Sequence, residues 1–376
     1  MNERRQKTLG FVSAQCFVEG VAGAYLYSTA CSEPTLYSST YAAMTRSLYG
    51  ELNRMEDGVR IDWAGYINSF QDDDGLYRDP AIWDQGWYAG DPLWCGRSHL
   101  TCHVVTALAC LGGSAPKPMT FLDPWRDADR MRKWLGERDW GERVAWTGNE
   151  IMNIGTLLQY ARDFHNDNAA GRAVSAMLDW LAENHIGAET GIWGDLDVTD
   201  PVQRSQAVQA AYHWWPLFFY DDRPIPHIER AIDTVLSTQN AAGGFGWNAP
   251  SSSERPPSSA CEDIDSIDPL CRMMQRTDYR CDDIETALRH AAKWVLTNQM
   301  GDGGFVFVLD QPFEYGHPQL RGETNRGAMF PTWFRTLSLA LIGKALPNHP
   351  LGQIRWTFTQ CPGMQFWCGT MEEEDG

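Results

Sequence analysis

Residues 236–245 read Leu-Ser-Thr-Gln-Asn-Ala-Ala-Gly-Gly-Phe, and residues 296–305 repeat this phrase as Leu-Thr-Asn-Gln-Met-Gly-Asp-Gly-Gly-Phe. A third copy, Phe-Gln-Asp-Asp-Asp-Gly-Leu-Tyr, occupies residues 70–77, and a degenerate copy, Ala-Glu-Thr-Gly-Ile-Trp-Gly, occupies residues 188–194. Segments with helical periodicity separate the copies. Such self-similarity predicts a repeat architecture, in which each unit buries its apolar face against its neighbours.

The spacing of the glycines predicts how many units the chain holds. Gly243, Gly303 and Gly363 follow one another at intervals of 60 residues. The 116 residues between Gly75 and Gly191 leave room for one hidden copy. Six units of about 50 to 60 residues therefore fill the chain from the first of these glycines onward, and each is long enough for two helices and two loops.

The segments between the phrases favour an all-α fold. Apolar residues recur at helical spacing in 149–164 and 284–296, among others, and the best strand candidate, 305–309, is short. Because every unit needs neighbours, we expect one domain over residues 61–376. Residues 1–60 are less regular and are expected to form an N-terminal helical extension or a flap.

The composition excludes some classes of function and localisation. The net charge is −18 and no basic cluster is visible, which argues against nucleic-acid binding and against a diphosphate site without metal ions. Ten cysteines without C-x-x-C spacing indicate reduced thiols in a cytoplasmic protein. No stretch approaches the ~20 apolar residues of a membrane span, although peripheral contact with a membrane surface stays open.

The Gln and aromatic phrases resemble the repeat of the prenyltransferase and squalene-cyclase (terpenoid cyclase) superfamily. The resemblance implies an (α/α)6 toroid of six helical hairpins, with six inner helices around a pore and six outside. In physical terms, the side chains of Gln71, Gln239 and Gln299 can satisfy backbone groups at helix ends, and Phe245 and Phe305 can fill the wedge between hairpins. We therefore interpret these residues as structural. The shape alone does not decide the function.

The strongest candidate for chemistry is the acidic run in residues 261–269, Cys-Glu-Asp-Ile-Asp-Ser-Ile-Asp-Pro, which follows a Pro/Ser-rich loop at 248–259. Carboxylates clustered among apolar residues cannot all ionise, so one retains its proton and can act as an acid at neutral pH. Asp265 and Asp268 share one helical face, and Asp263 lies nearer the helix start. The alternative is that the acids only cap the helix.

The phrase Asp263-Ile264-Asp265 also resembles the D-x-D-D acid motif of class II terpene cyclases, in which the central Asp protonates an alkene or epoxide. The resemblance implies that Asp265 is the proton donor and that Asp263 or Asp268 tunes it. The fourth position of the motif is Ser266 rather than Asp.

Aromatic and polar side chains elsewhere are expected to line a cavity and bind the substrate, because aromatic faces stabilise carbocations. The candidates are His103, Trp146, Asn149, His213, Trp214, Trp333 and Arg335. His99 and His103 have i, i+4 spacing, but no third ligand of suitable geometry accompanies them, so we expect a cavity base or a buried histidine rather than a metal site.

Two enzymatic hypotheses and one non-enzymatic hypothesis follow. The first is a terpene-cyclase-like enzyme that cyclises an isoprenoid by protonation; it needs no cofactor unless a diphosphate substrate calls for Mg²⁺. The second is a carbohydrate-active toroid of the hydrolase or lyase type, with one of the acids in 263–268 paired to Asp74 or Glu150. The third is a toroid that binds a lipid or a protein partner without catalysis.

Overall fold

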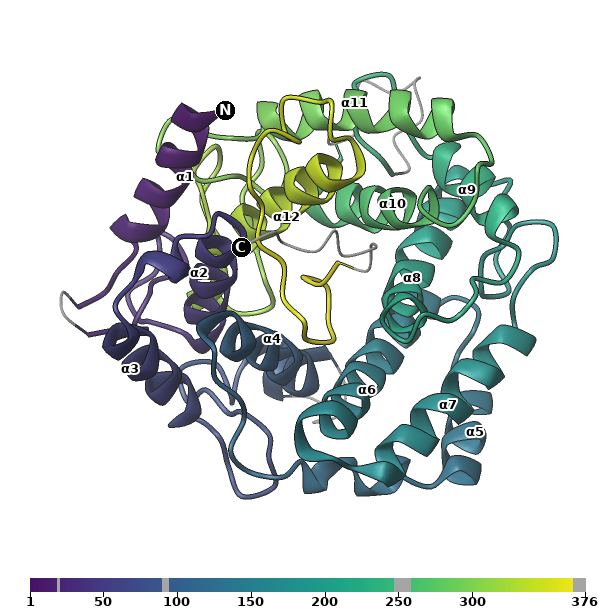
Figure 1. Cartoon of the computed structure of the whole chain (residues 1–376), viewed down its shortest axis with the longest axis horizontal. Helices are drawn as coiled ribbons and strands as arrows, with labels where there is room; N and C mark the ends of the chain where they lie inside the picture. Colours follow the sequence, from purple (N-terminus) through teal and green to yellow (C-terminus); the bar gives the residue numbers. More distant parts are fainter. Residues whose placement is uncertain (19–20, 90–94, 247–257, 368–376) are drawn as a thin grey trace, which may run out of the picture.

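The computed structural model describes residues 1–18, 21–89, 95–246 and 258–367, which form twelve α-helices in two concentric rings (Figure 1). The outer helices are α1 (Asn2–Ala14), α3 (Asp57–Asn68), α5 (Ala128–Gly136), α7 (Asn168–Glu183), α9 (Ile228–Leu236) and α11 (Cys281–Thr297). The inner helices are α2 (Leu36–Leu48), α4 (Cys95–Leu111), α6 (Val144–His165), α8 (Pro201–Tyr220), α10 (Ala260–Met273) and α12 (Met329–Ala345).

The inner helices form a closed ring, because each packs on the next in chain order and α12 returns to pack on α2. The remaining elements are short: η1 (Leu52–Arg54), η2 (Gly86–Ala89), η3 (Thr120–Trp125), η4 (Pro318–Leu320), and the antiparallel pair β1 (Phe313–Glu314) and β2 (Arg321–Gly322). The predicted all-α toroid in a single domain is confirmed. The strand candidate at 305–309 is not a strand, apart from isolated bridges at Phe305.

The difference in burial explains which helices lie inside. Every residue of α2, and every residue of α12 except Lys344, is buried. The outer helix α11 buries one stripe at i, i+3, i+4 and i+7 spacing, as an amphipathic surface helix does. That stripe consists of Ile284, Ala287, Leu288, Ala291, Ala292, Trp294 and Val295.

The repeated phrase ties one hairpin to the next. Gln239 forms an isolated bridge with Phe245, whose side chain is fully buried. The Gln239 amide donates to the carbonyl of Gly243 at 3.0 Å and to the carbonyl of Ala287 in α11 at 2.8 Å. Gly243 has a φ of +96°, a conformation that L side chains rarely adopt. The expected structural role of the phrase is confirmed.

Residues 1–60 belong to the ring, because α2 is one of its six inner helices. The segment before α2 carries a degenerate phrase in which Cys16 bridges Tyr25 and Gly23 has a φ of +96°. Sequence analysis missed this copy because Cys16 takes the place of the glutamine and lies seven residues before the glycine, instead of four as in the copies that have a glutamine. The six hairpins therefore begin with α1, and not at Gly75.

Contacts between the last and first hairpins complete the ring. The Gln299 amide donates to the carbonyl of Arg4 at 3.1 Å and to Thr8 Oγ1 at 2.9 Å, and both acceptors lie in α1. A Cβ at Gly303 would lie 2.2 Å from the carbonyl oxygen of Lys7, so only glycine fits where the last phrase meets this helix. The last hairpin thus uses its phrase to hold α1.

The C-terminal segment 346–367 crosses the ring and is drawn in yellow in Figure 1. Trp333 Nε1 of α12 donates to Gln365 Oε1 at 2.8 Å, and Gln365 Nε2 donates to the carbonyl of Met44 in α2 at 3.1 Å. The Phe366 carbonyl accepts a hydrogen bond from Arg272 of α10 at 2.9 Å. Bonds to three inner helices hold this segment across the end of the ring.

Candidate functional site

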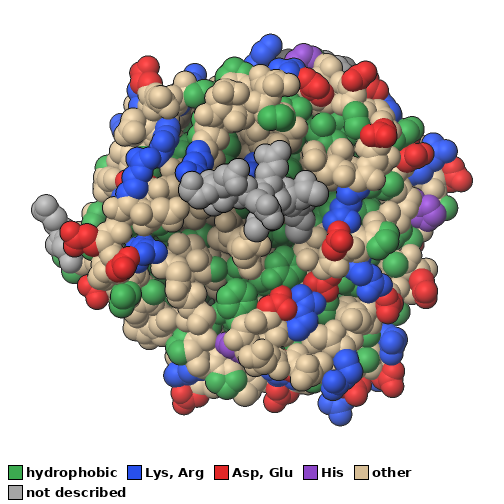
Figure 2. Space-filling view, in the orientation of Figure 1, with side chains coloured by type: hydrophobic (Ala, Val, Ile, Leu, Met, Phe, Trp, Pro, Cys, Tyr) green, Lys and Arg blue, Asp and Glu red, His purple; other side chains and the backbone are tan. Residues whose placement is uncertain are grey.

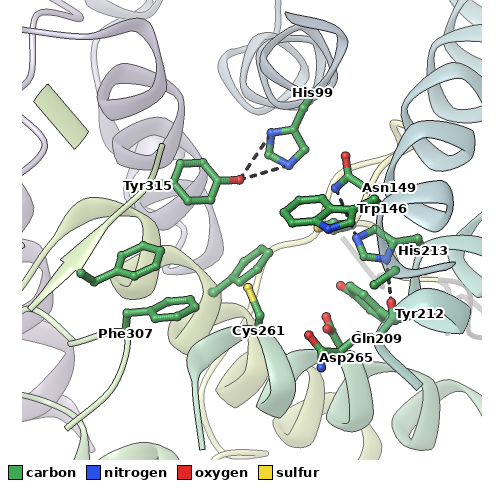
Figure 3. Close-up of a pocket in the computed structure, with 14 residues that line it drawn as sticks. His99, Trp146, Asn149, Gln209, Tyr212, His213, Cys261, Asp265, Phe307 and Tyr315 are labelled. Carbon is green, nitrogen blue, oxygen red and sulfur yellow. Dashed lines mark hydrogen bonds between the residues drawn. The ribbon is translucent and has the colours of Figure 1, made fainter. Parts of the chain in front are cut away.

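A cavity of about 220 Å³ lies inside the ring, where the N-terminal parts of α4, α6 and α10 meet the middle of α8 (Figure 3). Its lining is mostly aromatic and apolar, and in the described residues it contains one acid and no Lys or Arg. The lining residues are His99, Ala145, Trp146, Asn149, Gln209, Tyr212, His213, Cys261, Asp265, Phe307, Phe313, Tyr315, Phe334 and Met364.

The acidic run begins α10 and is positioned by a capping box. The Ser259 hydroxyl accepts from the Glu262 N–H, and the Glu262 carboxylate accepts from the Ser259 N–H at 2.9 Å. Glu262 therefore supplies the cap that sequence analysis weighed against catalysis, and the three aspartates are left for other roles. Residues 248–257 of the Pro/Ser-rich loop lie outside the described residues.

Asp265 is the acid of the cavity. Its side chain is 4% exposed, and in the part of the chain that the structure describes no group hydrogen-bonds to its carboxyl. Burial raises the pKa of Asp265 well above its usual range, and the nearby charges of Glu262, Asp268 and Asp263 raise it further. The environment therefore favours the protonated form of this carboxyl, which faces an aromatic space.

Asp263 has no exposed surface and does not line the cavity. It forms an ion pair with Arg335 of α12 at 2.7 Å, and it accepts hydrogen bonds from Trp294 Nε1 at 2.8 Å and from the Phe245 N–H at 2.9 Å. Burial raises the pKa of Asp263, and the Arg335 guanidinium opposes that rise. In the last hairpin the Phe305 N–H, which corresponds to that of Phe245, donates to Thr332 Oγ1 at 3.0 Å. The position of Asp263 on the inner helix therefore has the same structural role in both hairpins.

Asp268 is also buried outside the cavity lining and bonds to Arg272, one turn later on α10. Arg272 in turn donates to the Phe366 carbonyl and lies 4.1 Å from the Phe366 ring. Burial raises the pKa of Asp268, and Arg272 opposes that rise. Asp263 and Asp268 thus flank Asp265 along α10, and neither lines the cavity.

A hydrogen-bonded chain fixes the tautomer of His213. Because a carbonyl only accepts, His213 Nδ1 donates to the Gln209 carbonyl at 2.6 Å, and Nε2 accepts from the Asn149 amide at 3.3 Å. Asn149 in turn accepts from Asn153 at 2.9 Å. Burial lowers the pKa of His213 to about 4, so the ring is neutral at pH 7. We find a preorganised neutral imidazole on the α8 side of the cavity.

A second imidazole cluster lies across the cavity from Asp265 (Figure 3). His99 Nδ1 is 2.8 Å from the Tyr37 hydroxyl, its Nε2 is 3.1 Å from His103 Nε2, and the Tyr315 hydroxyl is 3.3 Å from the same His99 nitrogen. Burial lowers the pKa of His99 well below its usual range and that of His103 to about 3. Two neutral imidazoles and two phenols, those of Tyr37 and Tyr315, therefore share one hydrogen-bonded network.

The structure places some predicted binding residues in the cavity and others elsewhere. Trp146, Asn149 and His213 line it. His103 and Trp333 line a smaller space of about 10 Å³ behind it, and Trp333 is bonded to Gln365. The two remaining candidates are buried in the packing, Trp214 between Trp140 and Trp193 and Arg335 against Asp263.

Sequence analysis did not assign several lining residues to the site, notably Phe307, Phe313, Tyr315 and Met364. The first three come from the stretch before α12, where the run Phe305–Leu309 suggested a strand. The sequence did offer a signal for these three residues, because they cluster in a long connection directly before an inner helix. No sequence signal indicated Met364, because its position depends on where the C-terminal segment crosses the ring.

The second carboxylate of the proposed sugar-hydrolysing pair is not in this cavity. Asp74 forms an ion pair with Arg78 at 2.6 Å, and Glu150 lies 3.2 Å from Arg138. Neither acid lines the cavity, so a pair across a sugar ring is absent there within the described residues. Among those residues, no three His, Cys, Asp or Glu side chains are grouped as a metal ion would require. No described helix is long and apolar enough to span a membrane.

No protein-family model matches the chain, and no curated protein matches it. A solved polysaccharide lyase is 12% identical with a TM-score of 0.53, over 91% of this chain and 96% of that one. An unsaturated glucuronyl hydrolase from Streptococcus agalactiae is 10% identical with a TM-score of 0.53, over 91% and 90%. A type II terpene cyclase from Scytonema is 13% identical with a TM-score of 0.48, over 92% and 99%. These neighbours are enzymes, and at such identities the likeness shows the α/α-toroid fold alone.

Proposed function

We propose that this chain is a terpene-cyclase-like enzyme in which Asp265 protonates a carbon–carbon double bond of an apolar isoprenoid. One observation carries the proposal: a buried carboxyl, to which no group of the described residues hydrogen-bonds, faces an aromatic cavity. A protonated carboxyl of this kind is a Brønsted acid at neutral pH. The described lining contains no Lys or Arg, and Asp265 is its one acid. An uncharged, apolar part of a substrate therefore fits this space best.

The reaction needs no redox partner. The Asp265 O–H proton forms a C–H bond with the electron pair of the alkene, which leaves a carbocation on the neighbouring carbon. The faces of Trp146, Phe307 and Phe334 can stabilise this cation while a second double bond attacks it and closes a ring. A neutral imidazole, His99 or His213, then removes a proton to form the product alkene, and Asp265 recovers its proton from solvent. Mg²⁺ enters only if the substrate carries a diphosphate.

The test is incubation of the protein with prenyl alcohols, prenyl diphosphates, their epoxides and prenylated aromatics, with and without Mg²⁺, and mass spectrometry of the products. Asp265→Asn should reduce turnover by about 10²–10⁴-fold, because the amide keeps the shape but loses the acid. Asp62→Asn, an exposed carboxylate on α3, is the matched control and should have no effect. Unchanged turnover in folded Asp265→Asn would reject the acid role.

A second candidate is a carbohydrate lyase, favoured by two observations. The polysaccharide lyase and the glucuronyl hydrolase are among the neighbours with TM-scores above 0.5, and the cavity pairs the Tyr315 phenol with neutral His99. In an elimination, His99 would remove the proton next to a uronate carboxyl held by protonated Asp265. The C–O bond then breaks as the C=C bond forms, and Tyr315 protonates the departing oxygen and recovers that proton from His99.

Tyr315→Phe separates the two candidates. It removes the acid of the elimination, so lyase activity on uronate-containing oligosaccharides should fall by about 10²-fold or more. It leaves the Asp265 proton transfer in place, so cyclisation should persist with an altered product distribution. The appearance of unsaturated uronate is followed by ultraviolet absorbance, and cyclised products by mass spectrometry.

A further inference from the structure

A second pocket of about 200 Å³ lies near the C-terminal end of α2, and it shares no residue with the cavity. Three separate parts of the chain build it: α1, the turn after α2 with η1, and the C-terminal segment. Its lining residues are Arg5, Tyr49, Gly50, Asn53, Arg54, Arg355 and Thr357. Figure 2 shows basic side chains gathered over the part of this face where Figure 1 places α1 and α2.

The charge of this pocket is opposite to that of the whole chain. Three of its seven lining residues are arginines and none is acidic, although the chain carries a net charge of −18. Arg5 donates to the Tyr49 carbonyl at 2.7 Å and lies 5.7 Å from the Tyr49 ring, and neither contact is with a carboxylate. In the described residues neither Arg5 nor Arg54 forms a salt bridge.

The pocket is built on fixed backbone rather than on loose side chains. The Thr357 N–H donates to the Leu48 carbonyl at 3.0 Å, which joins the C-terminal segment to the end of α2. The neighbouring Trp356 packs its ring 5.1 Å from that of Tyr49. Gly50 turns the chain with a φ of +65°. The backbone positions that carry Arg355 and Arg54 are therefore set by the fold.

We propose that this pocket binds a small molecule bearing a phosphate or diphosphate group. Arginines from three segments of the chain line one pocket, and several guanidinium groups can bind the several oxygens of a tetrahedral phosphate, whereas a carboxylate offers two oxygens in one plane. Three positive charges also suit an anion of charge −2 or more. Asn53 and Thr357 add uncharged polar groups at the same wall. The site does not depend on the reaction assigned to the cavity, since no residue is common to the two.

Inorganic phosphate and pyrophosphate are the probes, and acetate at matched ionic strength is the comparison. Isothermal titration calorimetry and thermal melts of the full-length protein should show that pyrophosphate binds and raises the melting temperature, and that acetate does neither. The Arg54→Gln/Arg355→Gln double variant should bind pyrophosphate at least about tenfold more weakly, the scale of losing a charge-assisted hydrogen bond. Both side chains are exposed, so circular dichroism should show an intact fold.

Arg172→Gln is the control, because Arg172 is an exposed arginine on the outer helix α7. It should bind pyrophosphate like the unmodified protein. The proposal is overturned if pyrophosphate binds no better than acetate, if the double variant keeps its affinity, or if Arg172→Gln weakens binding equally. Turnover is not measured, so the outcome is independent of the function proposed for the cavity.

Discussion

The Asp263 carboxylate and the Arg335 guanidinium lie 2.7 Å apart, and neither side chain has any exposed surface. This ion pair joins α10 to α12 and also collects the Trp294 indole N–H and the Phe245 backbone N–H. It fixes the start of α10 against the neighbouring hairpin. The next acid along the helix, Asp265, is thereby held toward the cavity, and among residues 1–18, 21–89, 95–246 and 258–367 its carboxyl has no hydrogen-bond partner.

Arg335→Met should destabilise the protein strongly, because it leaves Asp263 buried and unpaired. The expected loss is about 3–5 kcal/mol in the free energy of unfolding, measured by urea denaturation. Asp263→Asn combined with Arg335→Met removes both charges and should lose less than Arg335→Met alone. A double variant as unstable as the sum of its single variants would show that the two side chains do not interact.

Asp265→Asn should make the fold more stable at neutral pH while it abolishes turnover. The folded-state pKa of Asp265 is raised, so the unfolded chain, with an ordinary aspartate pKa of about 3.9, releases its proton first as the pH rises. The carboxyl therefore lowers stability progressively above about pH 4, until the folded group also ionises. Urea denaturation at several pH values should show a gap between variant and unmodified protein that widens with pH by at most about 1.4 kcal/mol per unit. A gap that narrows with pH would contradict the raised pKa.

The buried histidines should make the fold sensitive to acid. His213 and His103 have folded-state pKa values of about 4 and about 3, below the ordinary value of about 6.5, so the unfolded chain takes up protons first as the pH falls. Stability present above about pH 6.5 should be lost as the pH falls toward these values. His213→Gln should flatten this loss in melts between pH 7 and 4.5, whereas His290→Gln, an exposed histidine of α11, should leave the slope unchanged.

Met364→Ala should lengthen the cavity. In the described residues Met364 is the one side chain that lines both the main cavity and the 10 Å³ space behind it, so it separates the two. The variant should gain affinity for longer prenyl alcohols relative to shorter ones, measured by calorimetry with geranylgeraniol and farnesol. Met152→Ala is the control, because Met152 lines the smaller space alone. Equal preference in both variants would mean that Met364 is not the partition.

Stability limits this experiment, since a buried methionine contributes to packing. Truncation of such a side chain costs about 2–5 kcal/mol, so melting temperatures should be recorded before affinities are compared. Met364→Leu keeps the volume and should retain the ligand preference of the unmodified protein.

The local phrases predicted the toroid because their chemistry acts within a few residues of chain. Gln239 reaches the Gly243 carbonyl four residues on, and a positive φ at Gly243 needs glycine wherever the phrase lies. The acidic run could likewise be read as a source of one retained proton, because four carboxyls within seven residues interact in any compact setting. The first hairpin was missed because its phrase has Cys16 in place of the glutamine, at a longer distance from the glycine than in the other copies.

Tertiary structure decided which of these acids pairs with an arginine and which one faces the cavity. Asp263 and Asp265 are two residues apart, and only the position of Arg335, 72 residues after Asp263, makes one an ion-pair partner and leaves the other free. The same holds for Met364 at the cavity and for the three arginines of the second pocket, which come from opposite ends of the chain. Local sequence specifies helix ends and turns through short-range hydrogen bonds. The identity of a buried charge's partner depends on which distant segments the closed ring brings within a few ångströms.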